Sequence, residues 1–176
     1  MSFSDPVNNI EQLGVNEGVV VADLGAGTGA YSLAVASKVG DDGMVYSVDV
    51  QKELLEQIKL SATSQNISNL EIIWGDIEKI SGTKLKDLSV DIVIVANILF
   101  QVEDKDTVIS EIKRILKQKG RVLIVDWVGS FNGLGPQLAD VVSEEQAKSL
   151  FEKEGFSYER SIMAGDHHYG IILRKI

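Results

Sequence analysis

The sequence contains no cysteine among its 176 residues, and this absence removes several classes of function at once. Disulfide bonds, thiolate metal sites and cysteine nucleophiles are all excluded. No apolar run approaches the roughly 20 residues that cross a membrane. Residues 1–6 also lack the basic and apolar regions of a signal peptide. We therefore expect a cytoplasmic protein with no membrane partner.

Positive charge is also scarce, and this argues against nucleic acid as a partner. The chain has 17 lysines and arginines against 26 acids, a net charge of −9 and a pI near 4.7. Binding to nucleic acid depends on neutralising phosphates with Lys and Arg. A small molecule or a protein is therefore the expected partner, and the sequence carries no indication of the oligomeric state.

The length fits a single domain over residues 1–176, large enough to bury roughly two thirds of its unfolded surface. Residues 1–14 are expected to hold a short helix after Pro6, with Ile10 and Leu13 facing inward and Gly14 at its end. This N-terminal helix is a candidate lid.

Apolar runs and helical patterns alternate along the chain, which predicts an α/β fold with a wound, mostly parallel sheet in three layers. Strands are expected over residues 19–24, 44–48, 70–74, 90–96, 121–127, 158–163 and 169–175. Helices are expected over residues 29–39 and 51–65. A third helix carries the apolar stripe from Val108 to Leu116 and ends at Lys117 to Gly120. A fourth begins at the capping box at Ser143 and stops at Gly155. Only five residues join the last two strands, so these must be antiparallel.

The stretch from Val19 to Ala30 is a short β-branched run that ends in glycines, which is typical of a cofactor site at a helix N-terminus. Gly25, Gly27 and Ala30 satisfy the dinucleotide fingerprint G-x-G-x-x-G/A, and Asp49 lies at the right distance for a ribose diol. Asp23, however, would repel a pyrophosphate and attract a cation. The fingerprint thus leaves an NAD(P)-binding oxidoreductase as the alternative interpretation, and Asp23 argues against it.

Ligands of wound sheets bind outside the carboxyl ends of the strands. In this chain those ends carry Asp23, Asp49, Asp76, Asn97, Asp126 with Trp127, and the loop Asp166–His168. Three acids that end the first three strands are unusual for a phosphate site and suit a cationic adenosyl ligand.

The spacing Asp23-x-Gly25-x-Gly27-x-Gly29 resembles the first motif of the class I S-adenosylmethionine-dependent methyltransferases. The terminal antiparallel hairpin is also similar to their Rossmann-like fold, in which strand seven inserts between strands five and six. The resemblance implies S-adenosyl-L-methionine as the cofactor. Gly25, Gly27 and Gly29 would pass under its methionine part, which Asp23 would hold.

The same resemblance implies roles at the next strand ends. Asp49 would accept both ribose hydroxyls, and Asp76 would accept the adenine amino hydrogens. The backbone N–H of Ile77 would serve a ring nitrogen, while Val50 and Ile77 would cover the two faces of the adenine. Asn97, which ends the fourth strand, belongs to the expected cofactor-binding set.

Residues Asn97–Val102 and Glu111–Asp126 look like the small-molecule methyltransferases related to quinone-biosynthesis enzymes. Those sequences usually carry histidine where this one has Phe100 or Gln101, so their substrate does not carry over. Asn97 lacks the Pro-Pro-aromatic sequel of the amino-group methyltransferases of nucleic acids and glutamine. Without cysteine, the thiol-based acceptor chemistry of arsenic methyltransferases is absent as well.

His167 and His168 are the only histidines, and their expected place on a loop at the ligand face makes them candidate general bases. A plain loop role is the alternative for both. Two adjacent histidines form a poor chelate, so no metal is expected. Asp23, Asp76 and Asp126 could likewise be structural hydrogen-bonding residues.

The function predicted from the sequence is methyl transfer from S-adenosylmethionine to a modestly hydrophobic small molecule. A non-catalytic S-adenosylmethionine-binding protein is a further alternative.

Overall fold

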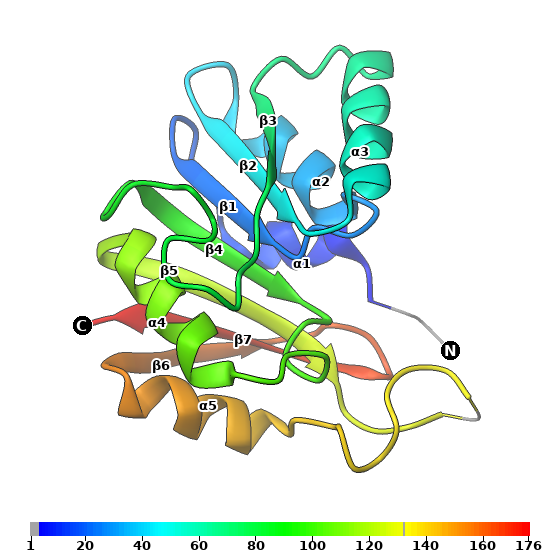
Figure 1. Ribbon diagram of the computed structural model, residues 1–176, viewed down its shortest axis with the longest axis vertical. Helices are drawn as coiled ribbons and strands as arrows, with labels where there is room; N and C mark the ends of the chain where they lie inside the picture. The colour runs from blue at the N-terminus through cyan, green and yellow to red at the C-terminus, as the bar shows by residue number, and fades with distance from the viewer. Residues whose placement is uncertain (1–3, 132) are drawn as a thin grey trace.

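The computed structural model describes residues 4–131 and 133–176, so parts of the expected lid (residues 1–3) and of the loop after the fifth strand (residue 132) lie outside it. The described chain has five helices and seven strands, which alternate except that β4 follows β3 and β7 follows β6 directly (Figure 1). Their bounds are α1 (Pro6–Leu13), β1 (Val20–Leu24), α2 (Ala30–Val39), β2 (Met44–Asp49), α3 (Lys52–Ser64), β3 (Leu70–Trp74), β4 (Val90–Ala96), α4 (Lys105–Ile115), β5 (Leu116–Trp127), α5 (Glu144–Lys153), β6 (Phe156–Ile162) and β7 (His168–Lys175).

The strands form one sheet in the order β3-β2-β1-β4-β5-β7-β6. The first five strands in this order are parallel, and β7 pairs antiparallel with both β5 and β6. The expected α/β fold is confirmed, including the insertion of the last strand between its two predecessors. The carboxyl ends of β1, β2 and β4 therefore meet at one edge of the sheet.

Helices cover both faces of the sheet, and β4 shows how its sequence divides between them (Figure 1). Successive side chains of a strand point to opposite faces. Val93 and Val95 lie in the apolar cluster under α4 and α5. Ile92 and Ile94 lie in the cluster under α1 and α2. An apolar run with two buried faces is what a central parallel strand requires.

Helix α1 has the ends that the sequence predicts. The Asp5 carboxylate accepts hydrogen bonds from the N–H groups of Val7 and Asn8, and Gly14 ends the helix in the left-handed conformation. Ile10 and Leu13 are buried, as expected. No helix in the described residues is long and apolar enough to cross a membrane.

The boundary between α4 and β5 differs from the expectation. The helix ends at Ile115, and β5 begins at Leu116 rather than at residue 121. Leu116 pairs with Val90, and the register then shifts before Ile92 pairs with Arg121. Lys117, expected at the helix end, instead donates to both carboxylate oxygens of Asp91 at 2.9 Å. Sheet pairing therefore replaces the last turn that the apolar spacing predicted.

The core under α5 offers a test of packing. Phe151 is fully buried, and its ring meets that of Phe156 edge-on at 5.3 Å. We expect Phe151→Ala to lower the free energy of unfolding by about 3–5 kcal/mol through loss of burial and creation of a cavity. The exposed Leu138 provides a control, and Leu138→Ala should stay within about 0.5 kcal/mol of wild type. Urea denaturation measures both, and a loss below about 1 kcal/mol for Phe151→Ala would contradict the packing described.

Candidate functional site

The glycine-rich turn between β1 and α2 forms the floor of the site. Gly25, Gly27 and Gly29 all have positive φ angles, of 70°, 54° and 79°, which side chains with a Cβ rarely adopt. A Cβ on Gly25 would also collide with the side chain of Ile98, and one on Gly29 would lie 2.6 Å from Cγ1 of Ile58. Conformation therefore favours glycine at all three positions, and lack of space adds to this at Gly25 and Gly29.

Two adjoining cavities open above this turn. One, of about 250 Å³, is lined by Asp49, Val50, Asp76 and Ile77, and the other, of about 270 Å³, by Asp23 and Asn97. Both cavities are also lined by Gly25, Gly27, Ile98 and Gln101. The structure thus brings the expected cofactor residues together, except that Gly29 packs on Ile58 and lines neither cavity.

Asp23 is the penultimate residue of β1, and its carboxylate is buried, with only 2% of the residue exposed. The Ser32 hydroxyl donates to it at 2.6 Å, and the Ser47 hydroxyl donates in turn to Ser32 at 2.7 Å. Burial raises the pKa of Asp23 to about 6, and the nearby Asp49 carboxylate adds to the rise. A cation in the adjoining cavity would favour the ionised form of Asp23.

The Asp49 carboxylate connects two segments of the site. One oxygen accepts a hydrogen bond from the N–H of Gly27 and the other from the N–H of Gln51, both at 2.9 Å. These bonds fix the glycine turn against the start of α3. Each oxygen keeps a second acceptor position, which suits the two hydroxyls of a vicinal diol.

The loop after β3 carries Asp76 and Ile77. Asp76 accepts from the N–H of Glu78 at 3.0 Å and pairs with Lys79 at 2.9 Å, and the Lys79 ammonium holds the pKa of Asp76 below its usual range. Asp76 therefore makes structural hydrogen bonds in the turn that follows it, which was the alternative role named from the sequence, and it also lines the cavity.

Glu111 on α4 holds this loop from below, a role that the sequence analysis missed. It accepts from the N–H of Ser81 at 2.8 Å and from the hydroxyl of Thr83 at 2.6 Å. Burial opposes its ionisation, but the hydrogen bonds from Arg114, Thr83 and two backbone N–H groups lower the pKa of Glu111 to about 2. The sequence feature that could have indicated this role is the position of Glu111 beside the apolar stripe of α4, three residues before Arg114.

Asn97 starts the loop after β4 and has a positive φ of 59°. Its side-chain oxygen is buried and has no hydrogen-bond partner among the described residues, although Asn97 lines the second cavity. Gln101 donates to the Asn97 carbonyl at 2.6 Å. An unpaired buried acceptor beside a glycine cradle fits a ligand that carries N–H donors. Ile98 and Gln101, which line both cavities, were not among the predicted residues.

Asp126 makes hydrogen bonds that hold the loop after β4. It is buried, and it accepts from the N–H of Leu99 at 2.9 Å and from its neighbour Trp127 at 2.8 Å. Burial raises the pKa of Asp126 to about 6. The residue therefore has the structural role that the sequence left open, because it orders the loop that lines both cavities.

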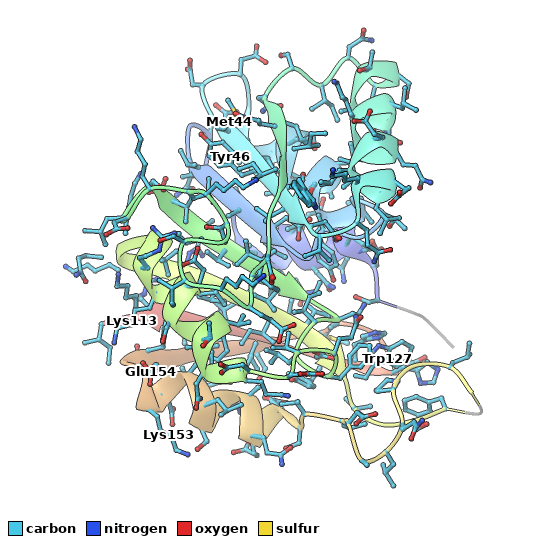
Figure 2. All side chains as sticks on the ribbon, in the orientation of Figure 1. Met44, Tyr46, Lys113, Trp127, Lys153 and Glu154 are labelled. Atoms are coloured by element: carbon cyan, nitrogen blue, oxygen red, sulfur yellow. The ribbon has the colours of Figure 1, made fainter. Side chains whose placement is uncertain are left out.

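The two histidines lie apart from both cavities. His168 is the first residue of β7 rather than part of a loop, because it pairs with Trp127 across the sheet. Figure 2 labels Trp127 at the end of β5, and the His168 ring packs on it at 4.3 Å. His167 packs on Phe131 at 4.2 Å. Burial lowers the pKa of His168, so its imidazole is neutral at pH 7.

A third cavity, of about 540 Å³, lies beside His168 and the N-terminal end of α1. Asp5 and Asn8 line it, whereas Ser4 and Pro6 line the cavity next to Asp23. The segment from Ser4 to Asn8 therefore forms a wall between the two spaces. Among the described residues, no group of three His, Asp or Glu side chains is placed to hold a metal ion.

Comparison with known proteins agrees with this geometry. A family model described as a methyltransferase domain matches residues 15–169. The demethylmenaquinone methyltransferase of Lactobacillus johnsonii is 27% identical over 92% of this chain and 79% of that enzyme. The ubiquinone/menaquinone biosynthesis C-methyltransferase UbiE of Paraburkholderia phytofirmans is 30% identical over 85% of this chain, which spans only 61% of that enzyme.

A comparison with solved structures also finds methyltransferases. The crystal structure of a SAM-dependent methyltransferase from Aquifex aeolicus superposes with a TM-score of 0.88 and 26% identity, covering 99% of this chain and 91% of that one. These matches favour the methyltransferase interpretation over the NAD(P)-binding oxidoreductase.

The raised pKa of Asp23 generates a pH prediction for binding of S-adenosylmethionine. A cation binds the ionised carboxylate, so binding releases a proton wherever Asp23 is protonated in the free protein. We expect the Kd to be constant above pH 7 and to rise by up to about tenfold per unit as the pH falls below about 6. Calorimetry from pH 5 to 8 measures this. The variant Asp23→Asn should bind weakly with no such slope, and an equal slope in both proteins would assign it to another group.

Proposed function

The chain belongs to the class I S-adenosylmethionine-dependent methyltransferases, and we propose that this enzyme methylates a small molecule bound beside the methionine end of the cofactor. The observation that carries the proposal is the pair of adjoining cavities over one glycine turn. Acids line both cavities, and an unpaired amide oxygen lines one of them.

In the first cavity, we assign the adenosine part of the cofactor to four residues. Asp49 accepts the ribose hydroxyls on the lone pairs that its backbone bonds leave free. Asp76 accepts the adenine amino group, the N–H of Ile77 donates to a ring nitrogen, and Val50 covers one face of the ring. Glu111 supports this recognition indirectly, since it holds the loop that carries Asp76.

In the second cavity, we assign the methionine part to Asp23, Asn97 and the glycine turn. Gly27 leaves open space next to the backbone, the missing Cβ of Gly25 makes room for the Ile98 side chain that lines both cavities, and Gly29 is the N-cap of α2. Asn97 accepts an N–H of the ammonium group through its buried oxygen. Asp23 stabilises the positive charge from the floor of the site.

The cofactor supplies an activated methyl group on a sulfonium, which is already a good leaving group. The protein therefore has to align the acceptor and exclude water, and it needs no strong catalytic cluster. We place the acceptor between the Ser4–Asn8 wall and the end of β5, where the third cavity begins. His168 is our candidate base, since its neutral ring can take a proton at pH 7. His167 is the second candidate, from the loop beside it.

The methyl acceptors of the relatives cannot be assigned to this chain. Phe100 and Gln101 stand where the quinone-biosynthesis enzymes usually carry a histidine, and the absence of cysteine removes thiolate ligands for arsenite. The assignment therefore stops at a small-molecule acceptor.

Binding of S-adenosylhomocysteine tests the cofactor assignment. We expect Asp49→Asn to weaken binding about 10- to 100-fold, because hydrogen bonds to a charged group contribute about 1.5–3 kcal/mol. Asp42, on an exposed turn, offers the matched control Asp42→Asn, which should bind like wild type. Calorimetry measures both. Binding of NAD by the wild-type protein without binding of S-adenosylhomocysteine would refute the assignment.

Turnover of the acceptor tests the base. If His168 takes the proton during transfer, His168→Gln should lower kcat by about 10²- to 10⁴-fold with little change in the Kd of S-adenosylhomocysteine. The same measurement on His167→Gln tests the second candidate. Unchanged turnover in both variants would remove the histidines from the mechanism.

A further inference from the structure

A chain of two buried serine hydroxyls lies behind the Asp23 carboxylate. The Ser47 hydroxyl on β2 donates to the Ser32 hydroxyl on α2 at 2.7 Å, and Ser32 donates to a carboxylate oxygen of Asp23 on β1 at 2.6 Å. Both serines are 0% exposed. Ser47 also lies directly opposite Asp23 in the ladder between β1 and β2. Three elements of the fold thus contribute one side chain each to a single polar chain.

Neither serine is placed to touch a ligand. Asp23 lines the second cavity, whereas Ser32 and Ser47 are not among the described residues that line this cavity or the first one. An effect of either hydroxyl on a bound ligand therefore passes through the carboxylate of Asp23.

The direction of the hydrogen bonds favours a charged carboxylate. A hydroxyl has one proton to donate, so Ser32 accepts from Ser47 and gives its own proton to Asp23. The backbone N–H of Ser32 donates to Asp23 as well. Hydrogen bonds donated to a carboxylate stabilise its ionised form, and bonds in a chain polarise one another. Both hydroxyls therefore support the negative charge of Asp23.

The other groups around Asp23 oppose its charge or leave it unchanged. Burial and the Asp49 carboxylate at the end of β2 both raise the pKa of Asp23. Burial and the Asp23 charge raise the pKa of Tyr31 on α2, so the phenol stays neutral. On β4, the residue opposite Asp23 is the apolar Ile94. No lysine or arginine is among the described residues that line the second cavity, so the donated hydrogen bonds hold the charge until a cation binds.

The packing of this layer does not itself require the two hydroxyls. Val45, on the same face of β2 as Ser47, lies in the apolar cluster under α1 and α2. Alanines at positions 32 and 47 would fill nearly the same space without burying a hydroxyl. Replacing both partners of a buried hydrogen bond by apolar groups is often nearly neutral for stability. What the hydroxyls add is therefore their effect on Asp23.

We propose that Ser32 and Ser47 are positioning residues that keep the Asp23 carboxylate ionised and fixed for the cationic cofactor, and so set the cofactor's affinity without touching it. The inference rests on the proposed function, because it assigns Asp23 to the positive charge of S-adenosylmethionine. Ser32 acts on the carboxylate directly. Ser47 acts through Ser32 and has the smaller effect.

Binding of S-adenosylmethionine to Ser32→Ala between pH 6 and 8.5 tests the direct contact. Loss of a hydrogen bond to a charged group should raise the pH at which Asp23 ionises by about one to two units. From the wild-type pKa of about 6, the variant's Kd should exceed that of wild type by about 5- to 50-fold at pH 6 and about two- to tenfold at pH 7. At pH 8.5 the two should agree within about twofold. Calorimetry measures both proteins, and the ratio of their Kd values cancels the titration of the cofactor itself.

Ser47→Ala should show the same trend with a smaller amplitude. We expect its Kd to exceed that of wild type by about two- to fourfold at pH 6, and to agree with wild type at pH 8.5. The matched control is Ser37→Ala on the same helix, since the exposed Ser37 hydroxyl donates to the Ala34 carbonyl. Its Kd should equal that of wild type at every pH. A merely structural loss in a serine variant would raise the Kd by the same factor at every pH.

A second measurement asks whether the serines act through Asp23. In the Asp23→Asn background, which has no charge to support, Ser32→Ala and Ser47→Ala should each change the Kd by less than about twofold at pH 6. Titration with millimolar cofactor reaches the weak binding expected of these variants. Equal effects of a serine substitution in the two backgrounds would overturn the inference.

The two levels of the proposal fail in different ways. If wild-type protein binds S-adenosylmethionine but the serine variants bind like wild type at pH 6, or weaken binding equally at all pH values, the serine inference is wrong and the proposed function stands. If Ser32→Ala does not fold, Ser47→Ala decides by the same criteria. If wild-type protein does not bind S-adenosylmethionine, the proposed function itself is wrong.

Discussion

The Asp49 carboxylate is the interaction on which the site depends. It holds the N–H of Gly27 and the N–H of Gln51, and so joins the turn after β1 to the start of α3. The carbonyl of Val48, one residue earlier, accepts from the N–H groups of Gly25 and Ala26. The ends of two parallel strands are thus joined by hydrogen bonds in addition to their ladder. The cavities on either side keep their shape because this turn cannot move independently of the sheet.

Two buried acids with the same raised pKa have different surroundings, and the difference separates their roles. Asp126 accepts from two backbone N–H groups and so has its acceptor capacity used within the chain. Among the described residues, Asp23 accepts hydrogen bonds only from Ser32, through its hydroxyl and its backbone N–H, and it lines a cavity. Burying a carboxylate with so few donors is costly unless a positive charge arrives. Hydrogen bonds within the chain offset the free-energy cost of burying the Asp126 carboxylate. At Asp23, a cationic ligand would offset that cost.

Most of the fold could be predicted from the sequence because strand ends and helix caps are local. The acids at the carboxyl ends of β1, β2 and β3 each come at or after the end of an apolar run, and the capping box at Ser143 is present. The end of α4 could not be predicted, since Leu116 continues the helical apolar spacing while its pairing with Val90 draws it into β5. Glu111, Ile98 and Gln101 were missed for a related reason. Their roles arise from contacts between segments distant in sequence, and no spacing rule reports such contacts.

The position of α1 limits how the acceptor can reach the cofactor. Arg121 donates to the carbonyls of Leu13 and Gly14, and Arg160 donates to that of Gln12, so the C-terminal end of the helix is held on β5 and β6. At its other end, Ser4 shares hydrogen bonds with Tyr31 and Asn9, and residues 4–8 separate the two spaces. A lid movement of the whole helix would break all of these bonds. A movement confined to residues 4–8, which separate the third cavity from the cavity beside Asp23, would spare the bonds of Arg121 and Arg160, but it would break those at Ser4, the Asp5 cap and the bond from the Asn9 N–H to the Asp5 carbonyl.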